Sequence, residues 1–172
     1  MPKEPIITMD EILRDIRKKH SVKIGTLSDV VEPVEVLTTG NIAIDSITGI
    51  GGLPIGRVTE LYGDPSSGKS TLGLQTAAEL QKRILASGSD ERILYLDFER
   101  TLDEDYAAGL GIDPEHPSFI LVQPYWLEQG AEIARKVIDA GTVRLSVWDS
   151  LAEMTPKSTL DAEFDRRTGA ME

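Results

Sequence analysis

The chain has 172 residues, of which 40% are hydrophobic, which suits one domain with a substantial core and leaves little room for two. It has no cysteine, which excludes disulfides and cysteine redox chemistry, and no apolar run near the roughly 20 residues that span a bilayer, so we expect a cytoplasmic protein with no membrane contact. The formal charge of −11 argues against nucleic-acid binding by bulk electrostatics, so that any DNA contact has to be local.

The N-terminal segment predicts a short amphipathic helix that runs to about residue 19. Thr8 and Glu11 have the spacing of a capping box. The apolar residues of this helix form one narrow stripe: Ile12, Leu13 and Ile16. The stripe packs either on the chain's own domain or on a neighbouring subunit, and residue types and their spacing favour neither arrangement.

The next segment leads toward a glycine-rich loop. Residues 34–37 predict a short strand, Asn41 is a candidate cap for a short helix through Ile47, and residues 49–54 predict a tight turn. Residues 57–62 alternate between apolar and polar side chains and predict a strand that ends at the loop.

The loop itself has the spacing of a phosphate-binding loop. Its residues are Gly63, Asp64, Pro65, Ser66, Ser67, Gly68, Lys69 and Ser70. The glycines let successive backbone N–H groups point inward at a helix N-terminus, where they can bind a phosphate. Lys69 is expected to reach the β- and γ-phosphates, and the Ser70 hydroxyl to bind the accompanying magnesium ion. A helix expected over residues 70–86 supports nucleotide binding over an ordinary strand-turn-helix corner.

Beyond this helix, strands alternate with helices. We predict strands at residues 92–97, 118–122 and 143–149, and helices at residues 103–110 and 128–140. This order predicts an α/β fold in which a mostly parallel, twisted sheet carries helices on both faces. Such sheets bind their ligands at the carboxyl ends of the strands.

Three carboxylates lie at the ends of the predicted strands or just after them. Asp149 is a candidate magnesium ligand, which we favour over a capping role because a phosphate loop lies upstream. Glu99 and Asp97 are both candidates for the general base that activates a water molecule. Residue type and position make the two nearly equal candidates. Tyr106 could stack on adenine, although a tyrosine in a short helix is more often half-buried packing.

From about Glu35 to its end the chain resembles one family, the bacterial RecA-type recombinases and their phage relatives. The resemblance rests on residues 38–45, 51–57, 66–72, 74–75, 97–100, 102–103, 106–107, 148–152 and 155–157. It therefore extends well beyond the phosphate loop. It implies a RecA-like phosphate-loop ATPase core over residues 35–172, preceded by an arm over residues 1–34 that packs against the next subunit.

The resemblance also implies roles for single residues. Glu99 falls on the catalytic position, Asp103 and Tyr106 fall on adenine-contacting positions, and Thr71 continues the nucleotide site. The family binds ATP and magnesium at subunit interfaces, assembles into helical filaments on single-stranded DNA, and promotes homologous pairing and strand exchange in DNA repair. Residues 161–169 correspond to its first DNA-binding loop, so Arg166 and Arg167 are candidate phosphate contacts, with a solvated charged tail as the equal alternative.

The chain also departs from the family pattern. It ends at Glu172, before the expected second DNA-binding loop, the later strands and the C-terminal domain, so we expect an incomplete sheet with an exposed edge. We therefore expect weak nucleotide binding, and poor hydrolysis and strand exchange unless another chain supplies the rest. Trp148 replaces a usually aliphatic residue and Arg100 a usual histidine, which indicates a diverged branch, such as a phage one.

Two other classes of function remain open. One is a non-catalytic protein that binds or modulates the filaments of a full-length relative. The other is a phosphate-loop kinase, which is disfavoured because the sequence has no obvious acceptor site or lid.

Overall fold

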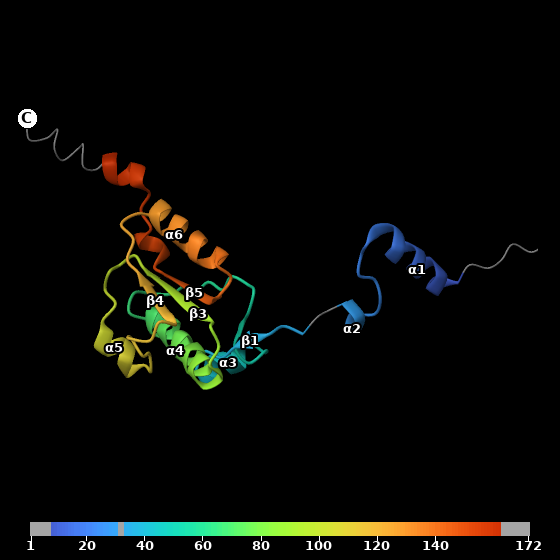
Figure 1. Ribbon diagram of the computed structural model, residues 1–172, viewed down its shortest axis with the longest axis horizontal. Helices are drawn as coiled ribbons and strands as arrows, with labels where there is room; N and C mark the ends of the chain where they lie inside the picture. The colour runs from blue at the N-terminus through green and yellow to red at the C-terminus, as the bar shows by residue number, and fades with distance from the viewer. Residues whose placement is uncertain (1–7, 31–32, 163–172) are drawn as a thin grey trace, which may run out of the picture. The chain divides into compact units, whose positions relative to one another are not determined.

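A computed structural model describes residues 8–30 and 33–162, and its contacts divide the chain into two units, Met1–Glu35 and Val36–Glu172. The first unit contains α1 (Met9–His20) and α2 (Leu27–Val30) (Figure 1). The predicted capping box is confirmed, since the Thr8 N–H donates to the Glu11 carboxylate at 2.9 Å and the Glu11 N–H donates to the Thr8 hydroxyl at 3.4 Å. No residue of α1 is buried, so its apolar stripe is not part of a core within this unit.

A three-stranded parallel sheet forms the centre of the second unit. It contains β3 (Arg92–Asp97), β4 (Phe119–Val122) and β5 (Val143–Asp149) in the order β4-β3-β5. The register pairs Tyr95 with Val147 and Asp97 with Asp149, so β3 and β5 end side by side. The predicted parallel sheet is confirmed, and its carboxyl edge carries the acidic residues that the sequence placed there.

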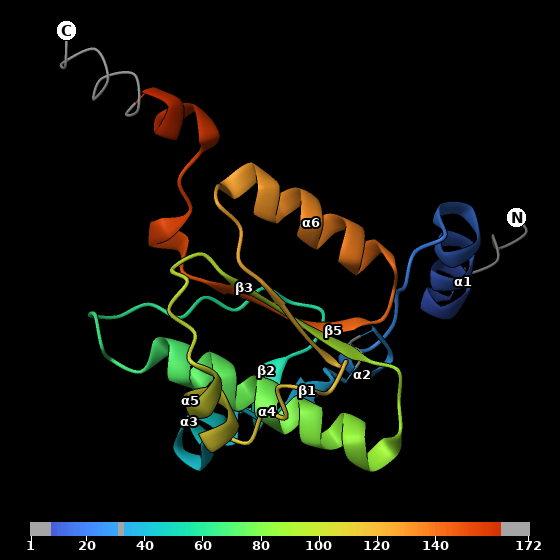
Figure 2. The same ribbon diagram turned by 60° about the vertical axis from the view of Figure 1, so that its left-hand side comes forward.

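Helices cover both faces of this sheet, as predicted. α4 (Lys69–Ser87) and α5 (Glu104–Gly109) lie on one face, and α6 (Leu127–Asp139) lies on the other (Figure 2). Alternation along β3 explains the two cores, because Ile93 and Tyr95 pack toward α4 while Leu94 and Leu96 pack toward α6. Each face of the sheet is thus apolar, as expected for a buried parallel sheet.

Small elements lead into the phosphate loop. β1 (Val36–Leu37) pairs with β2 (Leu53–Pro54) as an antiparallel ribbon, and α3 (Ile42–Ile47) lies between them in the chain. The Asn41 side chain caps α3, as predicted, by accepting from the N–H groups of Ala43 and Ile44. A 3-10 helix, η1 (Leu151–Glu153), follows β5.

The strand predicted at residues 57–62 is wrong. This segment has no regular structure, and Val58 is 99% and Tyr62 90% exposed. Alternation of apolar and polar residues specifies only which face of a strand would be buried, whereas a strand also needs a hydrogen-bonded neighbour. Of the described strands, β5 pairs only with β3, so its outer edge has no ladder to this segment.

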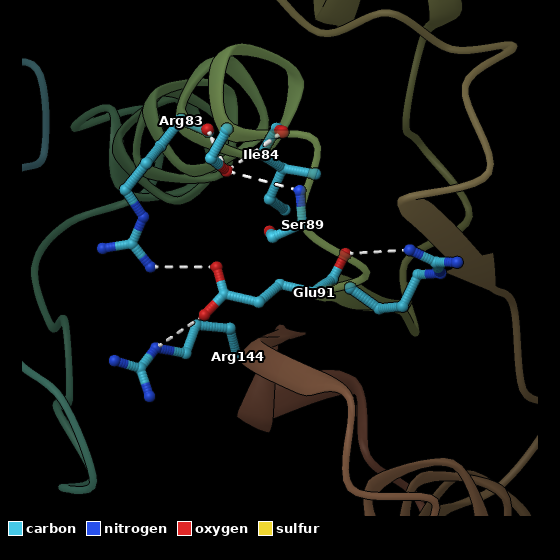
Figure 3. Close-up of polar contacts among 7 residues, drawn as sticks. Arg83, Ile84, Ser89, Glu91 and Arg144 are labelled. Carbon is cyan, nitrogen blue, oxygen red and sulfur yellow. Dashed lines mark hydrogen bonds and ion pairs between the residues drawn. The ribbon is translucent and has the colours of Figure 1, made fainter.

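Ion pairs link the elements at the amino-terminal ends of β3 and β5 (Figure 3). The carboxylate of Glu91, just before β3, accepts from Arg83 Nη2 of α4 at 3.2 Å, and its other oxygen lies 3.4 Å from Arg144 Nε of β5. One carboxylate thereby links α4 to the first residues of β3 and β5. These ion pairs lie away from the carboxyl ends of the strands. They connect α4, β3 and β5, the three elements that carry the candidate site.

Gly130 is required for close packing of α6, because a Cβ added there would lie 2.5 Å from Phe98 Cζ and 3.1 Å from Pro124 Cγ. Phe98 cannot easily move away, since its ring stacks on Trp148 with centroids 6.1 Å apart. We expect Gly130→Ala to lower the free energy of unfolding by about 1–3 kcal/mol through overpacking. Urea denaturation of the 172-residue chain measures this loss.

Gly109→Ala is the matched control. Gly109 is also helical, but a Cβ there meets nothing within 4 Å. Alanine should therefore be neutral or should stabilise α5 by up to about 1 kcal/mol. Equal effects of the two substitutions on unfolding would contradict the packing argument.

Candidate functional site

The phosphate loop ends at the start of α4, which has no side-chain cap. Its N-cap is Gly68, whose φ of 90° is left-handed, and Ser66 within the loop also has a positive φ of 61°. By contrast, the side chains of Thr8, Asn41 and Asp103 cap α1, α3 and α5. The first N–H groups of α4, a 19-residue helix, therefore lack a side-chain acceptor, which suits an anionic ligand.

Lys69 bridges the loop on which it lies. Its ammonium group donates to the carbonyl oxygens of Gly63 at 3.0 Å and Asp64 at 2.9 Å. The positive charge is thus held over the curled backbone, beside the uncapped helix end. Backbone N–H groups and a lysine together are the donor set that binds the phosphates of a nucleotide, so the residues present fit that ligand.

Few side chains of the described residues could bind a magnesium ion at this site. In the described part of the chain, no three Asp, Glu or His side chains converge on a point where they could hold a metal ion. The candidate ligands are the exposed Ser70 hydroxyl and the Asp149 carboxylate, both hard oxygen donors. This set fits a magnesium ion that takes its other ligands from water and nucleotide phosphates.

A cavity of about 680 Å³ lies along the loop. Its walls come from α3, the irregular segment before the loop, the loop and the first turns of α4, including Asn41, Tyr62, Lys69 and Gln75. Glu99, Tyr106 and Asp149 do not line it. The cavity therefore marks the loop side of the site but does not extend to the carboxylates that the sequence assigned to the same chemistry.

Asp97 is buried and fully engaged, with an exposed fraction of 2%. One oxygen accepts from the N–H groups of Arg100 at 2.7 Å and Thr101 at 3.4 Å, and the other accepts from the Leu102 N–H at 3.1 Å and Gln123 Nε2 at 3.0 Å. This carboxylate holds the turn after β3 in place. A group with both oxygens committed to the fold is a poor candidate for a general base.

Glu99 lies within that turn and is exposed. Its Oε1 accepts a hydrogen bond of 2.6 Å from the Ser150 hydroxyl, which follows directly after Asp149. Glu99 and Asp149 are thus connected through adjacent residues at the carboxyl ends of β3 and β5. The geometry favours Glu99 over Asp97 as the carboxylate available for proton transfer.

The Asp149 carboxylate accepts a hydrogen bond of 2.7 Å from the Tyr95 hydroxyl. Burial raises the pKa of Tyr95, and the hydrogen bond to Asp149 and the negative charges of Asp149, Asp97 and Glu99 raise it further. The phenol therefore stays protonated and donates to the carboxylate throughout the neutral range.

The predicted adenine contacts lie beside α4. Asp103 accepts from the Tyr106 N–H at 2.7 Å and caps α5, while the Tyr106 hydroxyl shares a hydrogen bond of 2.7 Å with the Thr71 hydroxyl. The Tyr106 side chain remains 47% exposed. The predicted adenine-contacting residues are thus linked to α4 by a hydrogen bond, and the ring of Tyr106 remains accessible.

Comparison with known proteins places this sequence in a family. The family model described as the RecA N-terminal domain matches residues 6–171. The chain belongs to the RecA family. It is 41% identical to Protein RecA of Agrobacterium fabrum (strain C58 / ATCC 33970) over 158 residues, covering 91% of this chain and 40% of the relative. It is 44% identical to Protein RecA of Xanthomonas axonopodis pv. citri (strain 306) over 156 residues, covering 91% of this chain and 42% of the relative. The chain thus spans about two fifths of the length of these RecA relatives, and the resemblance inferred from its motifs is confirmed.

Trp148 and Arg100, the residues that we expected to depart from the family pattern, both contact aromatic rings of this chain. Trp148 stacks on Phe98 on the α6 side of the sheet, and its Nε1 donates to the Ser146 hydroxyl at 2.9 Å. The Arg100 guanidinium lies 3.7 Å from the centroid of the Tyr125 ring and donates to the Gln123 carbonyl at 3.0 Å. Each of these two side chains is therefore held by an aromatic contact.

The structure brings together only part of the predicted RecA-type site. Within residues 33–162, no hydrogen bond joins Lys69 or Ser70 to Glu99 or Asp149. Arg166 and Arg167 lie outside the described residues. Sequence reasoning assigned no role to Tyr95 or Ser150. The signal for Tyr95 was a tyrosine between the leucines of a buried strand, on the face that also carries Asp97. No helix in the described ranges is both long and apolar enough to cross a membrane.

Proposed function

We propose that this chain is the nucleotide-binding part of an ATP-dependent DNA recombinase that acts in DNA repair in the cytoplasm. One observation carries the proposal: in a RecA-family chain, a phosphate loop at an uncapped helix end accompanies Glu99 and Asp149 at the ends of adjacent strands. Residues 1–34 would form the subunit-packing arm of a filament, and residues 35–172 the ATPase core.

The proposed site works through charge and positioning. Residues 63–71, with the Lys69 ammonium, would bind the phosphates of ATP, and Asp103 and Tyr106 would hold the adenine. Ser70 and Asp149 would hold magnesium, which when bound neutralises charge on the phosphates. The exposed Glu99, held by the Ser150 hydroxyl, would orient and deprotonate the attacking water.

Single-stranded DNA is the proposed partner, with homologous pairing and strand exchange as the outcome. The chain's net charge of −11 makes a broad electrostatic surface unsuitable, so contact would be local, with Arg166 and Arg167 as candidates. Exposed apolar residues of α1, such as Met9 at 67% and Ile12 at 41%, would contact the next subunit.

ATP turnover by the chain, measured with and without single-stranded DNA, tests this function. We expect slow turnover by the isolated chain, which requires magnesium and rises when single-stranded DNA is added. Magnesium-dependent turnover that DNA leaves unchanged would contradict a DNA-dependent ATPase.

A non-catalytic filament-binding protein is the second candidate, favoured by the unburied stripe on α1. It predicts that the chain sediments with filaments of a full-length RecA relative and shows no turnover of its own. Turnover without sedimentation would exclude it.

A further inference from the structure

Tyr95 lies in the middle of β3 and is 1% exposed, within the core between the sheet and α4. Its ring packs against Phe119 of β4 with centroids 5.9 Å apart. Packing at this place uses only the ring, and the side chains of the adjacent buried residues Leu94 and Leu96 have no polar atom. The hydroxyl of Tyr95 is thus the feature that packing alone does not explain.

That hydroxyl reaches the carboxyl edge of the sheet. Tyr95 is paired with Val147 in the register, and both pack toward α4, so Asp149, two residues after Val147, lies on the same face. The phenol spans this distance and donates to Asp149 Oδ2 at 2.7 Å. The ring is fixed by the core, and therefore the position of the hydroxyl is fixed as well.

We propose that Tyr95 is a positioning residue for Asp149, which it orients for binding of the divalent cation that accompanies the nucleotide. The inference rests on the proposed function, in which Asp149 holds magnesium. The hydrogen bond occupies Oδ2, so Oδ1 would be the oxygen available to the ion or to its water ligands. Hydrogen bonds that fix a ligating carboxylate commonly change metal affinity by about 10- to 100-fold when they are removed.

Tyr95→Phe removes the hydroxyl and keeps the ring. The chain is titrated with a fluorescent ADP, and the affinity is measured in EDTA and at increasing magnesium concentrations. We expect the half-saturating magnesium concentration to rise by roughly tenfold or more. The affinity in EDTA should stay within about twofold of the parent, because the variant leaves the phosphate loop unchanged.

Tyr125→Phe is the matched control, since it removes the same group from a tyrosine that is 66% exposed. Its magnesium dependence should equal that of the parent. An unchanged or tighter magnesium dependence in Tyr95→Phe would overturn the inference. So would an equal loss of affinity in EDTA, because it would show a role in the framework alone.

Asp149→Asn separates this inference from the proposed function. If Asp149→Asn abolishes the magnesium dependence while Tyr95→Phe does not affect it, the positioning role fails and the metal site stands. If Asp149→Asn also leaves the magnesium dependence intact, the metal role of Asp149 fails, and with it the inference. A magnesium dependence that is lost in Asp149→Asn and weakened in Tyr95→Phe supports both.

Discussion

Lys69→Ala is expected to weaken ATP binding by roughly 10- to 100-fold, since charge-assisted hydrogen bonds are worth about 1.5–3 kcal/mol. The ammonium is the only side-chain cation of the loop, and it is held over the loop carbonyls at 2.9 and 3.0 Å, where it can transfer to a phosphate. Titration with a fluorescent ATP analogue in magnesium buffer measures the change.

Lys82→Ala is the control for charge and for helix composition. Lys82 lies on the same helix, with its side chain 78% exposed, and its carboxylate neighbour Glu79 is 4.0 Å away. We expect this variant to bind ATP as the parent does. A similar loss of affinity in both variants would mean that general electrostatics, rather than the phosphate loop, attracts the nucleotide.

Glu99→Gln is expected to lower ATP turnover by about 10²–10⁴-fold, the usual contribution of a general base. The amide keeps an oxygen that can accept from the Ser150 hydroxyl, so the turn should stay in place. Nucleotide affinity should therefore change little. Turnover is measured by phosphate release at saturating ATP with single-stranded DNA present, and affinity by titration.

Asp97→Asn gives the opposite pattern. Each oxygen of Asp97 accepts two hydrogen bonds, and an amide can replace only one of those oxygens. Leaving buried donors unpaired should lower the free energy of unfolding by about 1–3 kcal/mol. If Asp97→Asn instead keeps its stability and loses turnover while Glu99→Gln stays active, the general base is Asp97.

The comparison of these two carboxylates shows what a sequence can decide. Asp97 is the last residue of β3 and Glu99 lies two residues later, so residue type and spacing left them equivalent. Family resemblance favoured Glu99, and the structure adds a physical reason: Asp97 is buried among four donors, whereas Glu99 is exposed. Those donors come from the following turn and from Gln123, which is 26 residues away, and no local pattern predicts that contact.

Patterns within short stretches of the sequence predicted most of the helices and strands correctly. The capping residues Thr8 and Asn41 predicted the starts of α1 and α3, because a cap is completed within three residues. The apolar runs predicted β3, β4 and β5 and therefore the parallel sheet. The phosphate-loop motif predicted its own position at the start of α4, since the motif includes both the turn and the first helical residues.

Tertiary structure decided whatever needs a partner distant in sequence. Residues 57–62 have the pattern of a strand, yet form none in the described structure, because their hydrogen bonds would have to come from a neighbouring strand. The Tyr95 hydroxyl reaches Asp149, 54 residues away in the chain, only because β3 and β5 pair in this register. The sequence by itself therefore determined the family, the sheet and the phosphate loop; the fold alone decided which carboxylate is buried and which tyrosine reaches Asp149, since those depend on contacts between strands.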